Sequence, residues 1–236
     1  MVRSELIKRS PLRIFEKSIH GGLGKGNIGI LASKKGVGKT ACLVHIATDQ
    51  LFQDKQVIHV SFAAKVDHII NWYEDIFKEI AKKRNLESAV EVHDEIIRNR
   101  VIMNFNQHGV KTEQILSSLR AMISDGNFAA DTVIFDGYNI ELASPEDLAL
   151  IGDFAKELNL EMWFSVSLGT DPADEIFDED GVPYLVKSFI DWVSVLITLR
   201  FSGDHVRFQA VKDHDKLEPR DMHLKLDPRT LLIVEE

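Results

Sequence analysis

Short apolar runs alternate with stretches of helical spacing along the first two thirds of the chain. The apolar runs have the length of buried strands and lie at about residues 27–32, 57–62, 100–105, 132–136 and 161–167. The stretches between them carry an apolar residue every three or four positions and predict helices at about 39–52, 66–84, 86–98, 112–124 and 145–157. Strands that alternate with helices predict an α/β fold, with a mostly parallel sheet and helices on both faces.

The last third of the chain has a different pattern. After a short predicted helix at about 184–191, apolar runs follow one another with only turns between them, at about 192–201, 205–211, 222–226 and 230–234. Consecutive strands of this kind predict an antiparallel C-terminal extension at one edge of the sheet. We expect one domain over residues 1–236, with residues 1–20 as an arm or short helix packed on it.

The composition of the chain limits the kinds of partner and the cellular compartment that we expect. The formal net charge is −9, from 28 Lys and Arg against 37 Asp and Glu, which disfavours a nucleic-acid-dependent motor. Cys42 is the one cysteine, so the sequence has no disulfide framework and fits a reducing compartment. No apolar run has the length of a membrane span, and Met1–Lys8 lacks the apolar core of a signal peptide. We therefore expect a cytoplasmic protein without a membrane partner.

One segment carries the strongest chemical signal, because it joins an apolar strand to a helix through a glycine-containing turn. Unpaired N–H groups at the start of a helix attract anions, and glycines let the backbone wrap around a phosphate. A lysine at the end of such a loop reaches the β- and γ-phosphates, and the hydroxyl after it ligates Mg²⁺. The segment predicts a site for ATP or ADP with Mg²⁺ and reads Ser33, Lys34, Lys35, Gly36, Val37, Gly38, Lys39, Thr40 and Ala41.

The segment departs from the usual Gly-x-x-x-x-Gly-Lys-Ser/Thr pattern at its first position, where Ser33 replaces glycine. Serine is small, so we expect a weakened turn rather than a lost one. A basic surface turn before an ordinary helix is the alternative interpretation. The strand before the turn and the helix after it favour the phosphate site.

A nucleotide site also needs a carboxylate that orders Mg²⁺, usually at the end of a neighbouring buried strand. Asp136 has this place, because it ends the apolar run Thr132–Phe135 and Gly137 follows it. We predict that Thr40 and Asp136 are the metal-binding residues. An ordinary aspartate before a turn is the alternative.

The order of these elements resembles the RecA-like ATPases, particularly their KaiC and RadA branch, from about residue 12 to residue 234. The segments that carry the resemblance are Gly21–Gly26, Asn27–Thr40, Thr132–Asp136, Glu161–Ser167, Asp191–Leu196 and Val211–His214. The resemblance implies a RecA-like fold, a polar residue on the strand at 161–167, and an oligomer or protein partner. It also implies that Lys212 and His214 lie where this family has a segment that reaches a neighbouring subunit's nucleotide.

Two departures from the family bear on catalysis. The family's water-positioning glutamates are replaced by Ala63 and Ala64, and the arginine of its inter-subunit segment is replaced by His214. The site would lack a usual base and a usual charge stabiliser, so we expect a slow ATPase or a nucleotide-dependent switch. Glu141 and Asp171 are the nearest carboxylates in sequence that could substitute, and Ala64→Glu would restore the missing one.

Two other functions stay open at this point. A sensor or scaffold that binds nucleotide without hydrolysing it is one. The other is a dimerising ATPase, because Lys34–Thr40 is similar to the phosphate loop of MinD and ParA proteins, whose first lysine reaches the partner's nucleotide. Lys34 matches that lysine, but Lys35 replaces a glycine, and the rest of the chain lacks further motifs of that family.

Overall fold

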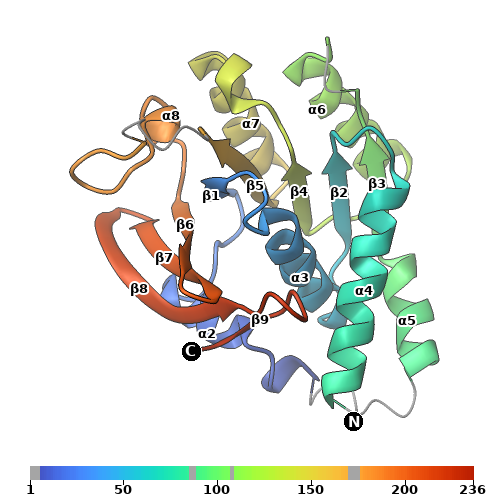
Figure 1. The fold of residues 1–236 in the computed structure, drawn as a ribbon. Helices are drawn as coiled ribbons and strands as arrows, with labels where there is room; N and C mark the ends of the chain where they lie inside the picture. Colours follow the sequence, from blue (N-terminus) through green and yellow to red (C-terminus); the bar gives the residue numbers. More distant parts are fainter. Residues whose placement is uncertain (1–5, 85–88, 107–108, 170–175) are drawn as a thin grey trace.

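The computed structural model describes residues 6–84, 89–106, 109–169 and 176–236. Its centre is a nine-stranded sheet with the strand order β3-β2-β4-β5-β1-β6-β7-β8-β9 (Figure 1). Neighbouring strands from β3 to β6 are parallel, and β7 to β9 continue the sheet as an antiparallel extension. The predicted α/β fold with a mostly parallel sheet and antiparallel C-terminal strands is confirmed.

The strand positions follow the apolar runs closely in the parallel part of the sheet. The parallel strands are β1 (Asn27–Lys34), β2 (Val57–Ser61), β3 (Arg100–Asn104), β4 (Thr132–Asp136), β5 (Glu161–Leu168) and β6 (Val195–Ser202). β1 runs two residues further than predicted, so Ser33 and Lys34 end a strand rather than begin a loop. β6 begins later than predicted, because the chain before it forms turns up to Ser194.

Two strands of the antiparallel extension, β7 and β8, are longer than their apolar runs, whereas the strand predicted at about 230–234 begins later, at Ile233. The extension consists of β7 (His205–Asp213), β8 (Lys216–Leu226) and β9 (Ile233–Glu235). The first half of β8 is largely exposed and polar, so hydrophobic periodicity did not reveal it. This half of β8 is held in a strand by backbone pairing with β7 across a turn at His214 and Asp215, since its side chains bury little surface.

Helices cover both faces of the sheet. One face packs against α2 (Leu12–Ser18), α3 (Lys39–Phe52), α4 (Asp67–Arg84) and α5 (Ala89–Arg98). The other face packs against α6 (Thr112–Arg120), α7 (Pro145–Glu157) and α8 (Tyr184–Lys187). In Figure 1, α3 and α4 lie in front of the sheet and α7 lies behind it. None of the described helices is long and apolar enough to cross a membrane.

Some helix boundaries match the predicted ones and others differ from them. The predicted helix at 112–124 is α-helical to Arg120 and continues as a π-helical turn, Ala121–Asp125. The predicted helix at 184–191 ends at Lys187. The start of α7 is as predicted, because the Ser144 hydroxyl accepts from the Asp147 N–H (3.2 Å) and the Asp147 carboxylate accepts from the Ser144 N–H (2.9 Å).

Candidate functional site

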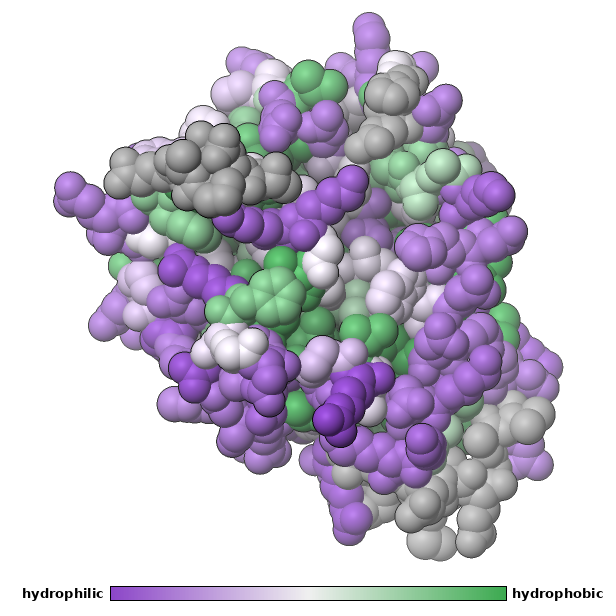
Figure 2. Space-filling model, in the orientation of Figure 1, coloured by the Kyte–Doolittle hydropathy of each residue, from purple (hydrophilic) through white to green (hydrophobic). Residues whose placement is uncertain are grey.

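The predicted site residues meet at one edge of the sheet. The carboxyl ends of parallel strands lie at the same edge, and here Ser33 of β1 is level with Ser167 of β5, while Ser61 of β2 is level with Asp136 of β4. The segment after β1 and the residues after β4 therefore border one open pocket of about 540 Å³. Figure 2 shows weakly polar and apolar surface at the centre of this face, framed by hydrophilic side chains.

The loop between β1 and α3 depends on two glycines. Gly36 and Gly38 have φ values of +81° and +113°, in the left-handed region that side chains with a Cβ rarely adopt. A Cβ on Gly38 would also collide with the side chain of Leu226 on β8. The antiparallel extension therefore packs directly against the loop, and only glycine fits at the residue that caps α3.

Lys39 lies folded back over the end of β1. Its Nζ donates to the carbonyl oxygens of Ser33 and Lys34, both at 3.1 Å, and to the Ser33 hydroxyl at 3.2 Å. The residue is 8% exposed, and this burial lowers the pKa of Lys39 to about 8, against the attraction of Asp136. Ser33 replaces the usual glycine, and its hydroxyl gives Lys39 an acceptor that the motif alone did not reveal.

Thr40 and Asp136 lie side by side, as the prediction of a shared metal site requires. The Thr40 hydroxyl donates to Asp136 Oδ2 at 2.9 Å. The other carboxylate oxygen, Oδ1, accepts from the Ser165 hydroxyl at 2.7 Å, and the Gly137 N–H donates to that hydroxyl at 2.9 Å. Ser165 is therefore the residue of β5 that holds the carboxylate, a role that the sequence indicated only as a polar position on this strand.

The donors at this position suit a hard divalent cation. A hydroxyl and a carboxylate offer oxygen ligands only, and Mg²⁺ commonly binds one or two such protein groups while phosphates and waters complete its shell. Within the described ranges, no group of three or more His, Cys, Asp or Glu residues could hold a metal by itself. Thr40 and Asp136 thus fit a metal that arrives with a phosphate ligand.

The pocket has an apolar wall that sequence reasoning missed. Its members come from the end of β6, from β7, β8 and the loop after β8, and from the first turns of α4, and they include Phe201, Val206, Leu226, Pro228, Leu231, Ile69 and Trp72. Phe201 is 69% exposed, so most of its ring is open to contact from outside the chain. These residues are scattered over the sequence, so no local motif could have identified them.

Ala63 and Ala64 differ in their position relative to the pocket. Ala63 lines the pocket, whereas Ala64 does not line it and is exposed to solvent. Among the described residues that line the pocket, Asp136 is the one carboxylate. Glu141 lies outside the pocket lining in the short 3-10 helix Ile140–Leu142, and Asp171 falls outside the described residues.

Lys212 and His214 lie away from this pocket. Because β7 runs antiparallel to β6, its end is at the opposite edge of the sheet. There, Lys212 Nζ donates to the Ile190 carbonyl (2.6 Å), and His214 Nδ1 lies 2.8 Å from Asp213 Oδ1. Their role between subunits remains a prediction.

No known family model matches the chain, and no curated protein matches its sequence. The residues and the geometry of the pocket therefore carry the function proposed below.

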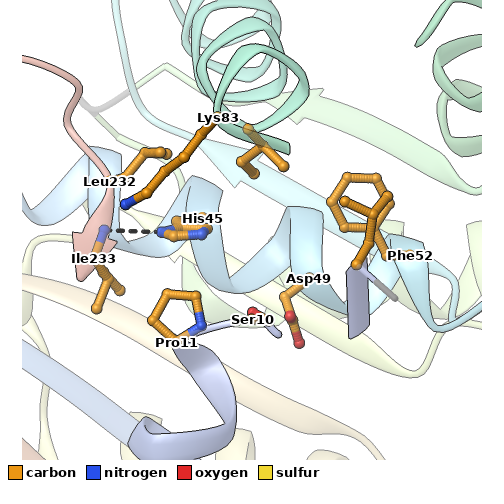
Figure 3. A pocket seen from close by; sticks show the side chains of 10 residues that line it. Ser10, Pro11, His45, Asp49, Phe52, Lys83, Leu232 and Ile233 are labelled. Atoms are coloured by element: carbon orange, nitrogen blue, oxygen red, sulfur yellow. Dashed lines mark hydrogen bonds between the residues drawn. The ribbon is translucent and has the colours of Figure 1, made fainter. Parts of the chain in front are cut away.

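A second pocket, shown in Figure 3, lies on the side of α3 that faces β9. His45 Nδ1 accepts from the Ile233 N–H at 3.0 Å, and Lys83 extends toward the imidazole. Burial lowers the pKa of His45 to about 3, with Lys83 acting in the same direction, so the ring is a neutral acceptor. With about 30 Å³ of space, this pocket has room for about one water molecule. We interpret it as the contact that fixes β9 to α3.

Proposed function

We propose that this protein binds ATP or ADP together with Mg²⁺ in the pocket between residues 35–41 and Asp136. In this proposal it acts as a RecA-like slow ATPase or as a nucleotide-dependent switch. The observation that carries the proposal is the 2.9 Å hydrogen bond between Thr40 and Asp136, which are 96 residues apart in the sequence. A basic surface turn before an ordinary helix gives no reason for a threonine in its first turn to meet a buried-strand carboxylate.

The phosphates would bind at the start of α3. The loop and the first residues of α3, Gly36–Ala41, line the pocket. N–H groups at the start of a helix have no intrahelical partner, and glycines leave room for an anion beside the backbone. Lys39 would exchange the carbonyls of Ser33 and Lys34 for phosphate oxygens, which carry a full negative charge and bind an ammonium more strongly. Mg²⁺, held through Thr40 and Asp136, would neutralise phosphate charge.

The apolar wall would receive the rest of the nucleotide. Phe201 and Trp72 offer aromatic surface for a base or a ribose, and the lining on this side includes Val206, Leu226 and Leu231. The described lining offers no second carboxylate that could act as a base, so the proposal is for tight binding and slow hydrolysis.

Comparison of ATP, ADP and AMP tests the proposal directly. A loop of N–H groups with a lysine recognises the β-phosphate, so we expect ATP and ADP to bind in the presence of Mg²⁺, with AMP at least tenfold weaker. Isothermal titration calorimetry on the purified chain measures all three affinities. Equal affinities for AMP and ATP would assign binding to the base alone, and no binding of any of the three would refute the proposal.

The metal part of the proposal has its own variant. Asp136→Asn keeps the shape and the acceptor for the Thr40 hydroxyl but removes the negative charge that attracts Mg²⁺. We expect the gain in ATP affinity on adding Mg²⁺ to fall about tenfold, while affinity in EDTA changes little. Thermal unfolding serves as the control for an intact fold. A variant with the Mg²⁺ dependence of the wild type would make Asp136 an ordinary strand-end residue.

A further inference from the structure

A buried histidine lies directly beneath the metal-binding carboxylate. His59 is in the middle of β2, level with Ile134 of β4, two residues before the pair formed by Ser61 and Asp136. Alternation along the strand places its side chain on the same face as that of Asp136. His59 is fully buried, and its Nε2 lies 4.0 Å from Asp136 Oδ2.

The second ring nitrogen of His59 has a partner. Nδ1 lies 3.0 Å from the hydroxyl of Tyr73 on α4. Burial lowers the pKa of His59 even though Asp136 raises it. Nε2 carries a hydrogen in the protonated ring and in one of the two neutral tautomers. A neutral ring carries one N–H, and the negative charge of Asp136 favours placing it on Nε2, with the Tyr73 hydroxyl donating to Nδ1. The opposite tautomer would turn a lone pair toward the carboxylate.

This arrangement leaves a donor without an acceptor. Nε2 is a buried nitrogen with no hydrogen-bond partner in the described part of the chain, and 4.0 Å is about 1 Å too long for a hydrogen bond. A buried polar group in this state is costly, so its persistence calls for an explanation. The nearest carboxylate oxygen, Oδ2, is the one that Thr40 contacts.

We infer that His59 is a positioning residue for Asp136, whose Nε2–H donates to Oδ2 when Mg²⁺ and nucleotide are bound. The inference rests on the proposed function. Mg²⁺ would engage the Thr40 hydroxyl oxygen and the carboxylate, and a small shift of Oδ2 toward His59 would close the gap. Because this hydrogen bond forms only in the loaded state, it increases the thermodynamic coupling between metal and nucleotide.

The same residues connect the metal position to the pocket wall. Tyr73 belongs to α4, the helix that contributes Ile69 and Trp72 to the lining. Arg100 of β3 lies over the Tyr73 ring, 4.3 Å from its centre, and limits the movement of the phenol. A fixed Tyr73 in turn fixes the orientation and the tautomer of His59.

Two substitutions at His59 separate positioning from packing. The amide nitrogen of glutamine occupies about the place of Nε2, whereas that of asparagine occupies about the place of Nδ1. His59→Gln therefore keeps a donor toward Asp136, and His59→Asn keeps only a polar group toward Tyr73. The quantity to measure is the ratio of the ATP dissociation constants in EDTA and in saturating Mg²⁺.

We expect His59→Asn to reduce this ratio about tenfold and His59→Gln to keep it within about threefold of the wild type, since a hydrogen bond to a charged group is lost in one and kept in the other. In the Asp136→Asn background, His59→Asn should have no further effect, because the acceptor's charge is already gone. A purely structural role would lower the melting temperature of both variants and leave the ratio unchanged, which would overturn the inference.

Should His59→Asn fail to fold, Tyr73→Phe tests the same inference. It removes the hydroxyl that fixes the tautomer and keeps the ring under Arg100. The ratio should then fall about threefold, and an unchanged ratio would contradict the inference. If the wild type binds ATP with a clear Mg²⁺ effect and the variants have the same ratio of dissociation constants, the inference about His59 fails and the proposed function stands. If the wild type binds no ATP, the proposed function fails and the inference with it.

Discussion

Replacing Lys39 by alanine is expected to weaken ATP binding about 100-fold. A lysine that contacts two phosphates makes charge-assisted hydrogen bonds, and losing such bonds in a partly enclosed site typically costs one to two orders of magnitude in affinity. Lys39 is 8% exposed and already held beside the loop. Its side chain therefore loses little conformational entropy when it binds a phosphate. Isothermal titration calorimetry with ATP and Mg²⁺ measures the loss.

Lys34→Ala is the matched control for this prediction. Lys34 has the same charge and lies at the end of β1, but its side chain is exposed and does not line the pocket. Its contact with Lys39 uses the backbone carbonyl, which alanine retains. We expect less than a threefold change in affinity. An equal loss in both variants would instead favour the MinD- and ParA-like alternative, in which Lys34 reaches a second copy's nucleotide.

The second large effect concerns turnover. A positioned general base contributes about 10²–10⁴-fold to rate, and the described lining of the pocket has Ala63 where a carboxylate could act on water. We expect the purified chain to hydrolyse ATP at least 100-fold more slowly than the roughly 10 s⁻¹ typical of enzymes. Release of labelled phosphate under saturating Mg²⁺ and ATP measures this rate.

Adding a carboxylate at residue 63 or 64 tests whether the missing base is the reason for slow hydrolysis. Ala63→Glu places the carboxylate in the pocket lining, while Ala64→Glu adds the same charge at a neighbouring residue outside it. We expect a rise in turnover at least tenfold larger for Ala63→Glu. The sequence pattern alone favours Ala64→Glu. Equal increases in turnover for the two variants would mean that a carboxylate at residue 64 can act as well as one in the pocket lining.

His68 is a further control, because it lines the pocket and carries an imidazole. Its Nε2 already accepts from the Trp72 indole N–H at 3.3 Å. His68→Ala should leave the slow rate unchanged. Rapid hydrolysis by the wild type, abolished by Lys39→Ala, would show that another group supplies the base and that the expectation of slow chemistry is wrong.

The sequence by itself determined the order of most elements and indicated the residues of the candidate site. The apolar runs of β2, β4 and β5 and the spacing of α3 and α7 depend on burial patterns that are local and strong, so their boundaries were predicted within one or two residues. The glycines before Lys39, together with the carboxylate that ends β4, identified both sides of the candidate site because each is a short segment with its own chemistry.

Tertiary structure alone decided how the pocket is closed and supported. Leu226 occupies the space that a Cβ on Gly38 would need, Ser165 holds Asp136, and His59 lies beneath it. The sequence indicated only a polar residue on the strand of Ser165 and carried no signal for the other two contacts. The contacts of Ser165 and His59 with Asp136 join strands that are adjacent in the sheet, β5 with β4 and β2 with β4. Leu226 reaches the loop before α3 from β8, which is separated from β1 by β6 and β7. A local pattern records which face of a strand is buried, but the neighbour that it meets follows from strand order, which is a property of the whole fold.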